Sequence, residues 1–368
     1  MTRSYIIAAC RSAVAPRNGA FAGCLPHELA APVITDLLRR AGVERDQVEE
    51  LVLANALGAG GNPARIAALA SDLPQSVGGL SLDRQCAGGL DAIILGDAMI
   101  RAGLHDVVIA GGAESYSRRP IRMHSFADGR PPEAYEQASF TPWPDRDPGM
   151  AEAAEALSQR LNISRIEQDK WAQGSHAKAR ASLPHLAAEI TPVAGLGQDS
   201  FTRDLTPRHC ARAKTVCGSI TAANMAVAAD GAAFVLMVSE RFARGHSGHA
   251  VAVQAGATMG ADPLQPGLAP VPALAKVLDQ SGLKPTDLVA AEVMEAFAVQ
   301  ALACQRGVGL PEEIVNRHGG ALARGHPIGA SGAILAVRLF HDLGSGGGAG
   351  VAAIAAAGGL GSALVLQA

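Results

Sequence analysis

The sequence predicts an α/β protein in which helices cover a sheet, built from two related halves with a helical insert. Short apolar runs of strand length alternate with Ala- and Leu-rich helical patterns over residues 4–116, and this alternation resumes after Gly218. The residues between these two regions are instead rich in Arg, His and Pro-containing turns. Two distant segments also repeat the same order of sequence features. From the alternation we expect mainly parallel strand pairing, with helices on both faces of the sheet.

Composition supports a large buried core. The chain has 368 residues, of which 48% are hydrophobic and only 18% charged, and this excludes a disordered protein. Aromatic residues are scarce at 4% while 42 residues are glycine, so the core must consist of Ala, Val, Leu and Ile with close backbone approaches. A formal net charge of -3 argues against nucleic acid or an anionic membrane as the main partner.

The first half and the insert contain the clearest individual elements. We predict strands at Tyr5–Ala9, Glu50–Ala54 and Asp106–Ala110. The insert holds both tryptophans, Pro-rich turns and two helices, one over Met150–Leu161 and one starting at Ser164, where Ser164 and Glu167 form a capping box. These features divide the chain into 1–117 with 219–243, an insert over 118–218, and 244–368.

A weak internal repeat supports duplication. In the first half CAGGLDAIILGDAMIRAG leads to DVVIAGGAES, and in the second HPIGASGAILAVRLFHDLG leads to GVAAIAAAGGLG. Each copy begins with a reactive side chain, Cys86 or His326, at the expected start of a helix. Packing of the two halves would place both side chains at corresponding helix starts, where they could share one site.

Three sequence features bear on location and metal binding. The N-terminal residues lack the layout of a secretory signal, and the uncharged stretch over 343–368 is broken by glycines, which favours a buried strand over a membrane span. The six cysteines show no CxxC pair and no metal-like spacing with histidine. We therefore expect reduced thiols, no metal and a cytoplasmic protein.

Cys86 and His326 are the candidate catalytic residues. A helix N-terminus lowers a thiol pKa and favours a nucleophilic thiolate, although a small buried hydrophobe is the simpler interpretation of any cysteine. The glycine-rich loop around His326 could instead cradle phosphate, but it lacks the P-loop lysine and the three-glycine dinucleotide pattern. His318 lies eight residues earlier and could compete for the same role; its simpler interpretation is a histidine in a surface loop.

Ordered motifs extend along nearly the whole chain: RSAVAPRNGAFAG, GNPARIAALA, the Cys86 segment, GGAESYS, EAFA, NRHGGALARGHPIGASGA and the terminal GGLG. With them the chain resembles the thiolase family, the acyl-CoA C-acyltransferases. The resemblance implies a duplicated αβαβα core, an inserted helical loop domain that holds coenzyme A, and a homodimer or homotetramer. It also implies acyl-CoA as substrate, an acyl acceptor that stays unknown, and no permanently bound cofactor.

The resemblance assigns roles to individual residues. Cys86 takes the acyl group and His326 activates it, while backbone N–H groups of Cys86 and near Ala357 hold the thioester oxygen. Gly358 and Gly359 follow as substrate contacts, and Gly325 as a contact of coenzyme A.

The chain departs from the family pattern at three positions, of which the first two bear on the second step and the third on the binding of coenzyme A. Ala355 stands where a thiolase has its second cysteine, and no cysteine follows Cys304. A methyl group cannot act as an acid or a base. Met294, before Glu295, replaces an Asn or His of the other oxyanion site, and Ala226 replaces a serine near the pantetheine.

One departure is a gain of charge. Arg324 occupies a position that is usually aliphatic, two residues before His326. It could bind a substrate carboxylate or phosphate; the simpler interpretation is an exposed or salt-bridged arginine.

Three functions are compatible with these residues. The first is an acyltransferase that keeps the Cys86 acyl-enzyme and uses a second step without a cysteine base, such as transfer to another nucleophile, hydrolysis, or condensation with a differently activated partner. The second is an ordinary thiolase in which Glu295, His318 or water replaces the missing group. The third is a non-catalytic coenzyme A-binding or scaffold paralogue in a larger complex. The joint retention of Cys86 and His326 favours an active enzyme.

Overall fold

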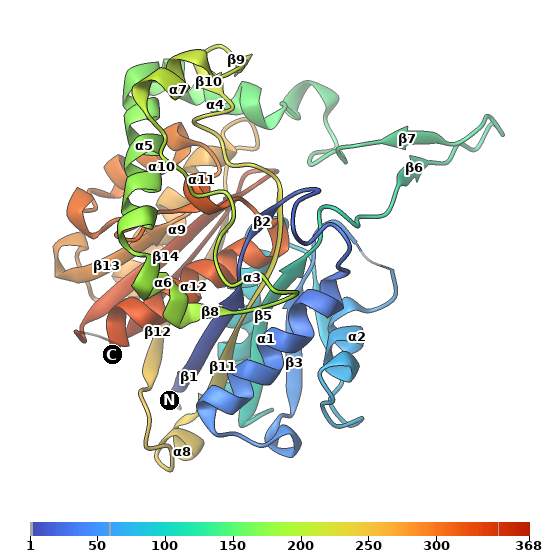
Figure 1. Ribbon diagram of the computed structural model, residues 1–368, viewed down its shortest axis with the longest axis vertical. Helices are drawn as coiled ribbons and strands as arrows, with labels where there is room; N and C mark the ends of the chain where they lie inside the picture. The colour runs from blue at the N-terminus through green and yellow to red at the C-terminus, as the bar shows by residue number, and fades with distance from the viewer. Residues whose placement is uncertain (1–2, 59, 345) are drawn as a thin grey trace.

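Two half-sheets form the centre of the protein. The computed structural model describes residues 3–58, 60–344 and 346–368 (Figure 1). Strands follow one another in the order β13-β14-β15-β12-β1-β11-β5-β3-β4. The first half-sheet contains β1 (Ser4–Ser12), β3 (Glu50–Ala54), β4 (Leu80–Leu82), β5 (Val107–Glu114) and β11 (Ala229–Ser239). The second contains β12 (Val251–Gly260), β13 (Leu288–Val293), β14 (Ala349–Ala356) and β15 (Leu360–Gln367). They join where Tyr5 of β1 pairs with Ala252 of β12.

The pairing pattern shows the duplication directly. In the first half β1 pairs antiparallel with β11, β11 antiparallel with β5, and β5 parallel with β3. In the second half β12 pairs antiparallel with β15, β15 antiparallel with β14, and β14 parallel with β13. The same order of connections therefore occurs twice, as the internal repeat predicted.

The expectation of mainly parallel pairing is wrong. The parallel pairs in the two half-sheets are β3–β4, β3–β5 and β13–β14, whereas the long central pairs are antiparallel. The reason is topological. β11 follows the insert and returns between β1 and β5, and β15 returns directly after β14 through a tight turn.

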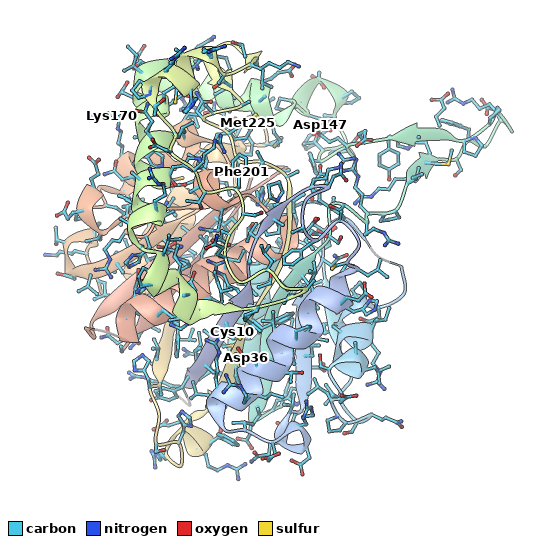
Figure 2. All side chains as sticks on the ribbon, in the orientation of Figure 1. Cys10, Asp36, Asp147, Lys170, Phe201 and Met225 are labelled. Atoms are coloured by element: carbon cyan, nitrogen blue, oxygen red, sulfur yellow. The ribbon has the colours of Figure 1, made fainter. Side chains whose placement is uncertain are left out.

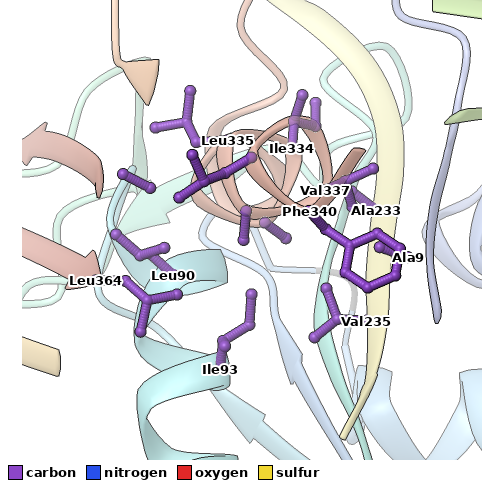
Figure 3. Close-up of a cluster of buried hydrophobic side chains, with 14 of the residues drawn as sticks. Ala9, Leu90, Ile93, Ala233, Val235, Ile334, Leu335, Val337, Phe340 and Leu364 are labelled. Carbon is purple, nitrogen blue, oxygen red and sulfur yellow. The ribbon is translucent and has the colours of Figure 1, made fainter. Parts of the chain in front are cut away.

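Helices cover the half-sheets and also separate them. α1 (Pro26–Ala41) and α2 (Pro63–Ala70) pack on the outer face of the first half-sheet, and α9 (Pro270–Ser281) on that of the second. Between the sheets lie α3 (Gly88–Arg101) and α12 (Ile328–Gly344), whose apolar side chains meet strands of both halves (Figure 3). These layers form the αβαβα architecture.

The central helices are held by a dense apolar cluster. Figure 3 shows Ile334 and Leu335 of α12 near Leu90 of α3, Val235 of β11 and Leu364 of β15. All five are buried, so the core joins the two halves around α3 and α12. Each fully buried Leu, Ile or Val contributes about 1.5–3 kcal/mol relative to exposure.

The insert forms a separate region over one end of the core. It appears in green in Figure 1, with a hairpin of β6 (Arg122–His124) and β7 (Glu133–Tyr135) that projects from the body. Its other elements are α4 (Met150–Leu161), α5 (Arg165–Ala181), α6 (Leu183–Glu189), β8 (Ile190–Thr191), α7 (Pro207–Arg212) and β9 (Thr215–Cys217). β9 pairs with β10 (Ile220–Thr221), which lies just after the insert. Connecting elements are β2 (Ala15–Pro16), α8 (Glu240–Ala243), α10 (Ala298–Val308) and α11 (Ala321–Arg324).

Most local predictions are confirmed. The three predicted strands lie within or overlap β1, β3 and β5, and the first insert helix has the expected bounds. Ser164 caps α5: the Glu167 N–H donates to its hydroxyl, and the Ser164 N–H donates to the Glu167 carboxylate at 2.8 Å.

The prediction for the C-terminal stretch needs correction. It forms two antiparallel strands, β14 and β15, joined at Ala357–Gly359, rather than one buried strand. Met1 and Thr2, in the N-terminal stretch, and Ser345, in the C-terminal one, lie outside the described residues. Within residues 3–58, 60–344 and 346–368, no helix combines the length and apolar character needed to cross a membrane.

Candidate active site

Cys86 and His326 meet between the two central helices, although they are far apart in the sequence. Cys86 precedes α3 and His326 precedes α12, and the Cys86 Sγ lies 3.1 Å from the His326 Nε2. The other ring nitrogen, Nδ1, lies 2.7 Å from the Ser331 hydroxyl in the first turn of α12. With Nδ1–H donating to Ser331, the Nε2 lone pair faces the thiol, which is the arrangement a base requires.

Two glycines allow the helices to come this close. A Cβ added at Gly89 of α3 would lie 2.7 Å from the Ala333 nitrogen of α12. A Cβ at Gly332 would overlap the Leu90 backbone. Glycine at these two positions therefore sets the separation of α3 and α12, and with it the contact between Cys86 and His326.

The turn before the nucleophile has an unusual backbone. Gln85 has a φ of 50°, in the left-handed region that non-glycine residues rarely occupy. This conformation turns the chain sharply between β4 and α3 and presents Cys86 to the cavity. Such a residue costs about 1–2 kcal/mol, which the surrounding packing must offset.

The expected lowering of the Cys86 pKa is wrong. Shielding by the surrounding protein raises the pKa of the Cys86 thiol to about 12, and the charges of Glu114 and Asp83 act in the same direction. Burial also lowers the pKa of His326 to about 4, with the Arg324 charge adding to this effect. At neutral pH the pair is therefore a thiol beside a neutral imidazole, because burial outweighs the field of the helix N-terminus.

Glu114 at the end of β5 fixes the start of α12. Its carboxylate accepts hydrogen bonds from the Gly329 N–H at 3.0 Å and the Ala56 N–H at 2.9 Å, and from the Asn55 side-chain amide at 2.7 Å. Burial raises the pKa of Glu114 to about 7, although these donors oppose the shift. The contact ties the helix that holds Ser331 to the first half-sheet.

A cavity of about 490 Å³ opens in front of the pair. Its lining includes Cys86, His326, Ala226, Ala355 and Ala357. The structure thus brings together five of the positions that the sequence singled out. Ala355, which the family resemblance aligns with a second cysteine, lines the same cavity as Cys86 and presents only a methyl group.

Other predicted positions lie outside the lining of this cavity: Met294, Glu295, Arg324, Gly325, Gly358 and Gly359. Met294 is fully buried and packs in the apolar core between the half-sheets. Met294 therefore supplies no hydrogen bond to the cavity, and its side chain instead contributes to the apolar packing between the half-sheets.

The hydrogen-bond partners of Glu295 indicate a structural role. Its carboxylate accepts hydrogen bonds from the Ser175 hydroxyl at 2.7 Å, the Asn316 amide at 2.8 Å, the Trp171 indole N–H at 3.0 Å and the Leu322 N–H at 3.2 Å. Trp171 and Ser175 lie on α5 of the insert, so Glu295 fastens the insert to the second half.

The surroundings of Arg324 match neither sequence-based interpretation, a substrate-binding residue or an exposed or salt-bridged arginine. It is buried, and its guanidinium makes no ion pair within 4.0 Å and no hydrogen bond among the described residues. It is therefore neither exposed nor salt-bridged, and it does not line the cavity. Burial lowers the pKa of Arg324 to about 10, and Arg338 lowers it further, while Glu292 and Asp199 oppose the shift.

Sequence reasoning missed several residues of the site. Ser331 had a usable signal, because it lies one turn after His326 at the helix start. Met225, Phe297, Met150 and Leu157 form apolar parts of the cavity wall; Figure 2 labels Met225. Met150 and Leu157 share one face of α4, whereas Met225 and Phe297 come from separate segments, so no single local pattern in the sequence groups all four.

Comparisons with known proteins agree with this geometry. Residues 4–241 match the family model of the thiolase N-terminal domain, and residues 249–368 match the thiolase C-terminal domain. The chain is 38% identical to the putative acetyl-CoA C-acetyltransferase YhfS of Bacillus subtilis (strain 168), over 95% of this chain and 98% of that protein. It is 35% identical to the putative acetyl-CoA C-acetyltransferase VraB of Staphylococcus aureus (strain MRSA252), over 96% and 99%.

A solved structure gives the same result for the fold. The crystal structure of the Bacillus anthracis acetyl-CoA acetyltransferase matches with a TM-score of 0.94 at 32% identity and covers 100% of this chain and 99% of that one. Together, the two family models, the duplicated fold and the paired Cys86 and His326 show that the chain belongs to the thiolase family of acyl-transferring enzymes.

Proposed function

We propose that this protein transfers an acyl group from an acyl-CoA through a thioester on Cys86, with His326 as the base. The observation that carries the proposal is the 3.1 Å contact between the Cys86 Sγ and the His326 Nε2 at the wall of the cavity. The pKa values make a base necessary, because burial keeps the thiol protonated and the imidazole neutral.

The first half-reaction then proceeds in two proton movements. As the Cys86 sulfur attacks the acyl carbonyl carbon, the thiol proton moves to the His326 Nε2. The bond between the carbonyl carbon and the coenzyme A sulfur breaks, and the departing thiolate takes the proton back from His326. Backbone N–H groups of Cys86 and Ala357 are the proposed donors to the carbonyl oxygen. The products are acyl-Cys86 and free coenzyme A.

The second half-reaction uses no cysteine base. Ala355 faces the cavity without a titratable group, and Met294 packs in the core. The substitutes considered above fit poorly: Glu295 is held by four donors, and neither Glu295 nor His318 lines the cavity. We therefore place the acceptor among nucleophiles that His326 itself can deprotonate, including water, or among partners activated elsewhere.

Intact-protein mass spectrometry tests the proposal. The chain is incubated briefly with acetyl-CoA and with longer acyl-CoAs, beside a Cys86→Ala variant. Cys217→Ala is the matched control, because Cys217 is also a partly buried cysteine but lies in β9 of the insert. We expect one acyl adduct on the native chain and on Cys217→Ala, and none on Cys86→Ala.

The decay of the adduct then identifies the acceptor class. Loss of the acyl group in buffer alone indicates hydrolysis, and loss only after addition of a second acyl-CoA indicates condensation. Absence of any adduct, despite measurable coenzyme A binding, would contradict the proposal and favour the non-catalytic paralogue.

A further inference from the structure

A second cluster of chemically active side chains lies at the opposite end of α12 from the active site. It consists of His185 on α6, His318 in the loop before α11, and Asp342 near the end of α12. Asp342 follows Ser331 by eleven residues in the same helix, which separates the two sites by about 16 Å along the axis. The cluster is thus independent of Cys86 and His326.

The two imidazoles converge on one carboxylate oxygen. The His318 Nε2 lies 3.1 Å and the His185 Nε2 lies 3.2 Å from the Asp342 Oδ1. The rings stack with centroids 3.8 Å apart and planes 19° from parallel. One ligand atom from each residue can be chosen so that all three lie within 4.8 Å of one another.

These separations suit a shared metal ion. Bonds of about 2.0–2.1 Å from a tetrahedral zinc ion to nitrogen and oxygen place neighbouring ligand atoms roughly 3.3 Å apart. The two nitrogen-to-oxygen separations are close to that value. Because the two rings now lie nearly parallel, binding also requires one imidazole to rotate until both ring planes pass through the ion. The His185 Nε2 is buried, and apart from its 3.2 Å approach to the Asp342 Oδ1 it has no polar partner among the described residues.

The hydrogen-bond partner of His318 favours a tautomer suited to metal binding. Its other ring nitrogen, Nδ1, lies 2.8 Å from the Ser182 hydroxyl. An Nδ1–H that donates to Ser182 leaves the Nε2 lone pair free, which is the tautomer a metal ligand needs. Such an outer hydrogen bond is usual for histidines that bind metals.

One edge of the cluster meets solvent. The side chains of His185 and His318 are 28% and 22% exposed, whereas the His185 Nε2 and the Asp342 Oδ1 are buried, so solvent reaches the imidazole rings rather than the carboxylate. The Arg317 guanidinium lies 3.6 Å from the Asp342 Oδ2 and is the competing cation; its side chain is 37% exposed.

We propose that His185, His318 and Asp342 form a binding site for a divalent transition metal, zinc in particular, with solvent completing the coordination. Two imidazoles and a carboxylate are donors that zinc accepts readily. The ion would join α6 of the insert to α12 of the second half, and so would stabilise the docking of the insert. The prediction of no metal rested on the lack of closely spaced cysteine and histidine, whereas these ligands are 133 and 24 residues apart in the sequence.

Zinc titration of the chelator-treated full chain, without a histidine tag, tests the proposal. A Cys86→Ala background removes the thiol that would otherwise compete for zinc, and isothermal titration calorimetry measures the affinity. We expect one zinc ion per chain and a higher melting temperature with zinc bound. His185→Gln and His318→Gln should each weaken binding about tenfold or more. His246→Gln, a histidine outside the cluster, is the matched control and should bind as the parent does.

Cobalt substitution identifies the ligands by spectroscopy. Cobalt in the site should give visible bands of a tetrahedral ion without a sulfur charge-transfer band. Absence of zinc binding to the Cys86→Ala chain would overturn the proposal without recourse to any further variant. Binding that survives both glutamine substitutions, in variants with native circular dichroism, would overturn it as well.

Discussion

Two groups of residues at the active site differ sharply in chemistry. In the first, called the polar wall, Cys86, His326 and Ser331 form a continuous chain of polar contacts at 3.1 Å and 2.7 Å. In the second, called the apolar wall, Ala355 and Ala226 line the cavity at positions where the family resemblance implies polar groups, while Met294 is packed into the core. Under the proposed function, the groups that would accept an acyl group are present, whereas Ala355 supplies no proton carrier for the carbon of a second substrate. The comparison therefore predicts that the two half-reactions of one active site can be lost or kept separately.

Removal of the base should have the largest effect on the polar wall. His326→Ala leaves the Cys86 thiol, with its pKa of about 12, without a proton acceptor. We expect the single-turnover rate of Cys86 acylation to fall about 10²- to 10⁴-fold. Rapid-quench mass spectrometry measures that rate. An unchanged rate would show that another group deprotonates Cys86, with His318→Ala as the control for a histidine outside the cavity.

Restoring a thiol on the apolar wall should produce the next largest effect. Ala355→Cys places an acid/base group in the cavity that Cys86 also lines. We expect thiolysis of a 3-ketoacyl-CoA by coenzyme A to rise about 100-fold, since general acid–base catalysis contributes at least that factor.

The control for this gain is Ala355→Ser, which has nearly the same size but a hydroxyl too weakly acidic for the role. Equal activity of the two variants would contradict proton transfer as the missing function. High thiolysis activity in the native chain would show that the comparison between the walls is itself mistaken.

The acylation rate should depend on pH with a midpoint well below the pKa of an ordinary histidine. Burial, with a contribution from Arg324, lowers the pKa of His326 to about 4, and only the neutral ring can accept the thiol proton. The acylation rate should therefore stay level from about pH 9 down to about pH 5 and decline about tenfold per unit once the pH is well below 4. Circular dichroism at each pH excludes acid unfolding as the cause. A midpoint near 6.5 would mean that the ring is hydrated in the working enzyme.

The smallest effect on chemistry is expected from Glu295→Gln. The glutamine amide N–H₂ would face donors that now bond to a carboxylate, so the free energy of unfolding should fall by about 1–3 kcal/mol, measured by denaturant titration. The acylation rate should stay the same, because Glu295 holds the insert and does not line the cavity. A large loss of acylation in a stable variant would restore Glu295 as a candidate base.

Much of the fold could be predicted from the sequence, because local interactions and the internal repeat indicate it. The same repeat indicated the pair Cys86 and His326. The capping box at Ser164, the first insert helix and the strand at Glu50–Ala54 depend on residues within a few positions of one another. The repeated order of features indicated the duplication, and it singled out Cys86 and His326 as residues at equivalent helix starts. The motifs of the family resemblance then supplied the αβαβα architecture.

The tertiary structure alone decided the remaining properties, because each depends on groups distant in sequence. β11 inserts antiparallel between β1 and β5, and no pattern within β11 states its neighbours. The pKa of Cys86 rises rather than falls because burial by both halves outweighs the local field of one helix. The inward packing of Met294 and the proximity of His185, His318 and Asp342 likewise depend on contacts between segments that are distant in the sequence. A sequence specifies which side chains are present and their local structure, whereas desolvation and proximity arise only when separate segments pack together.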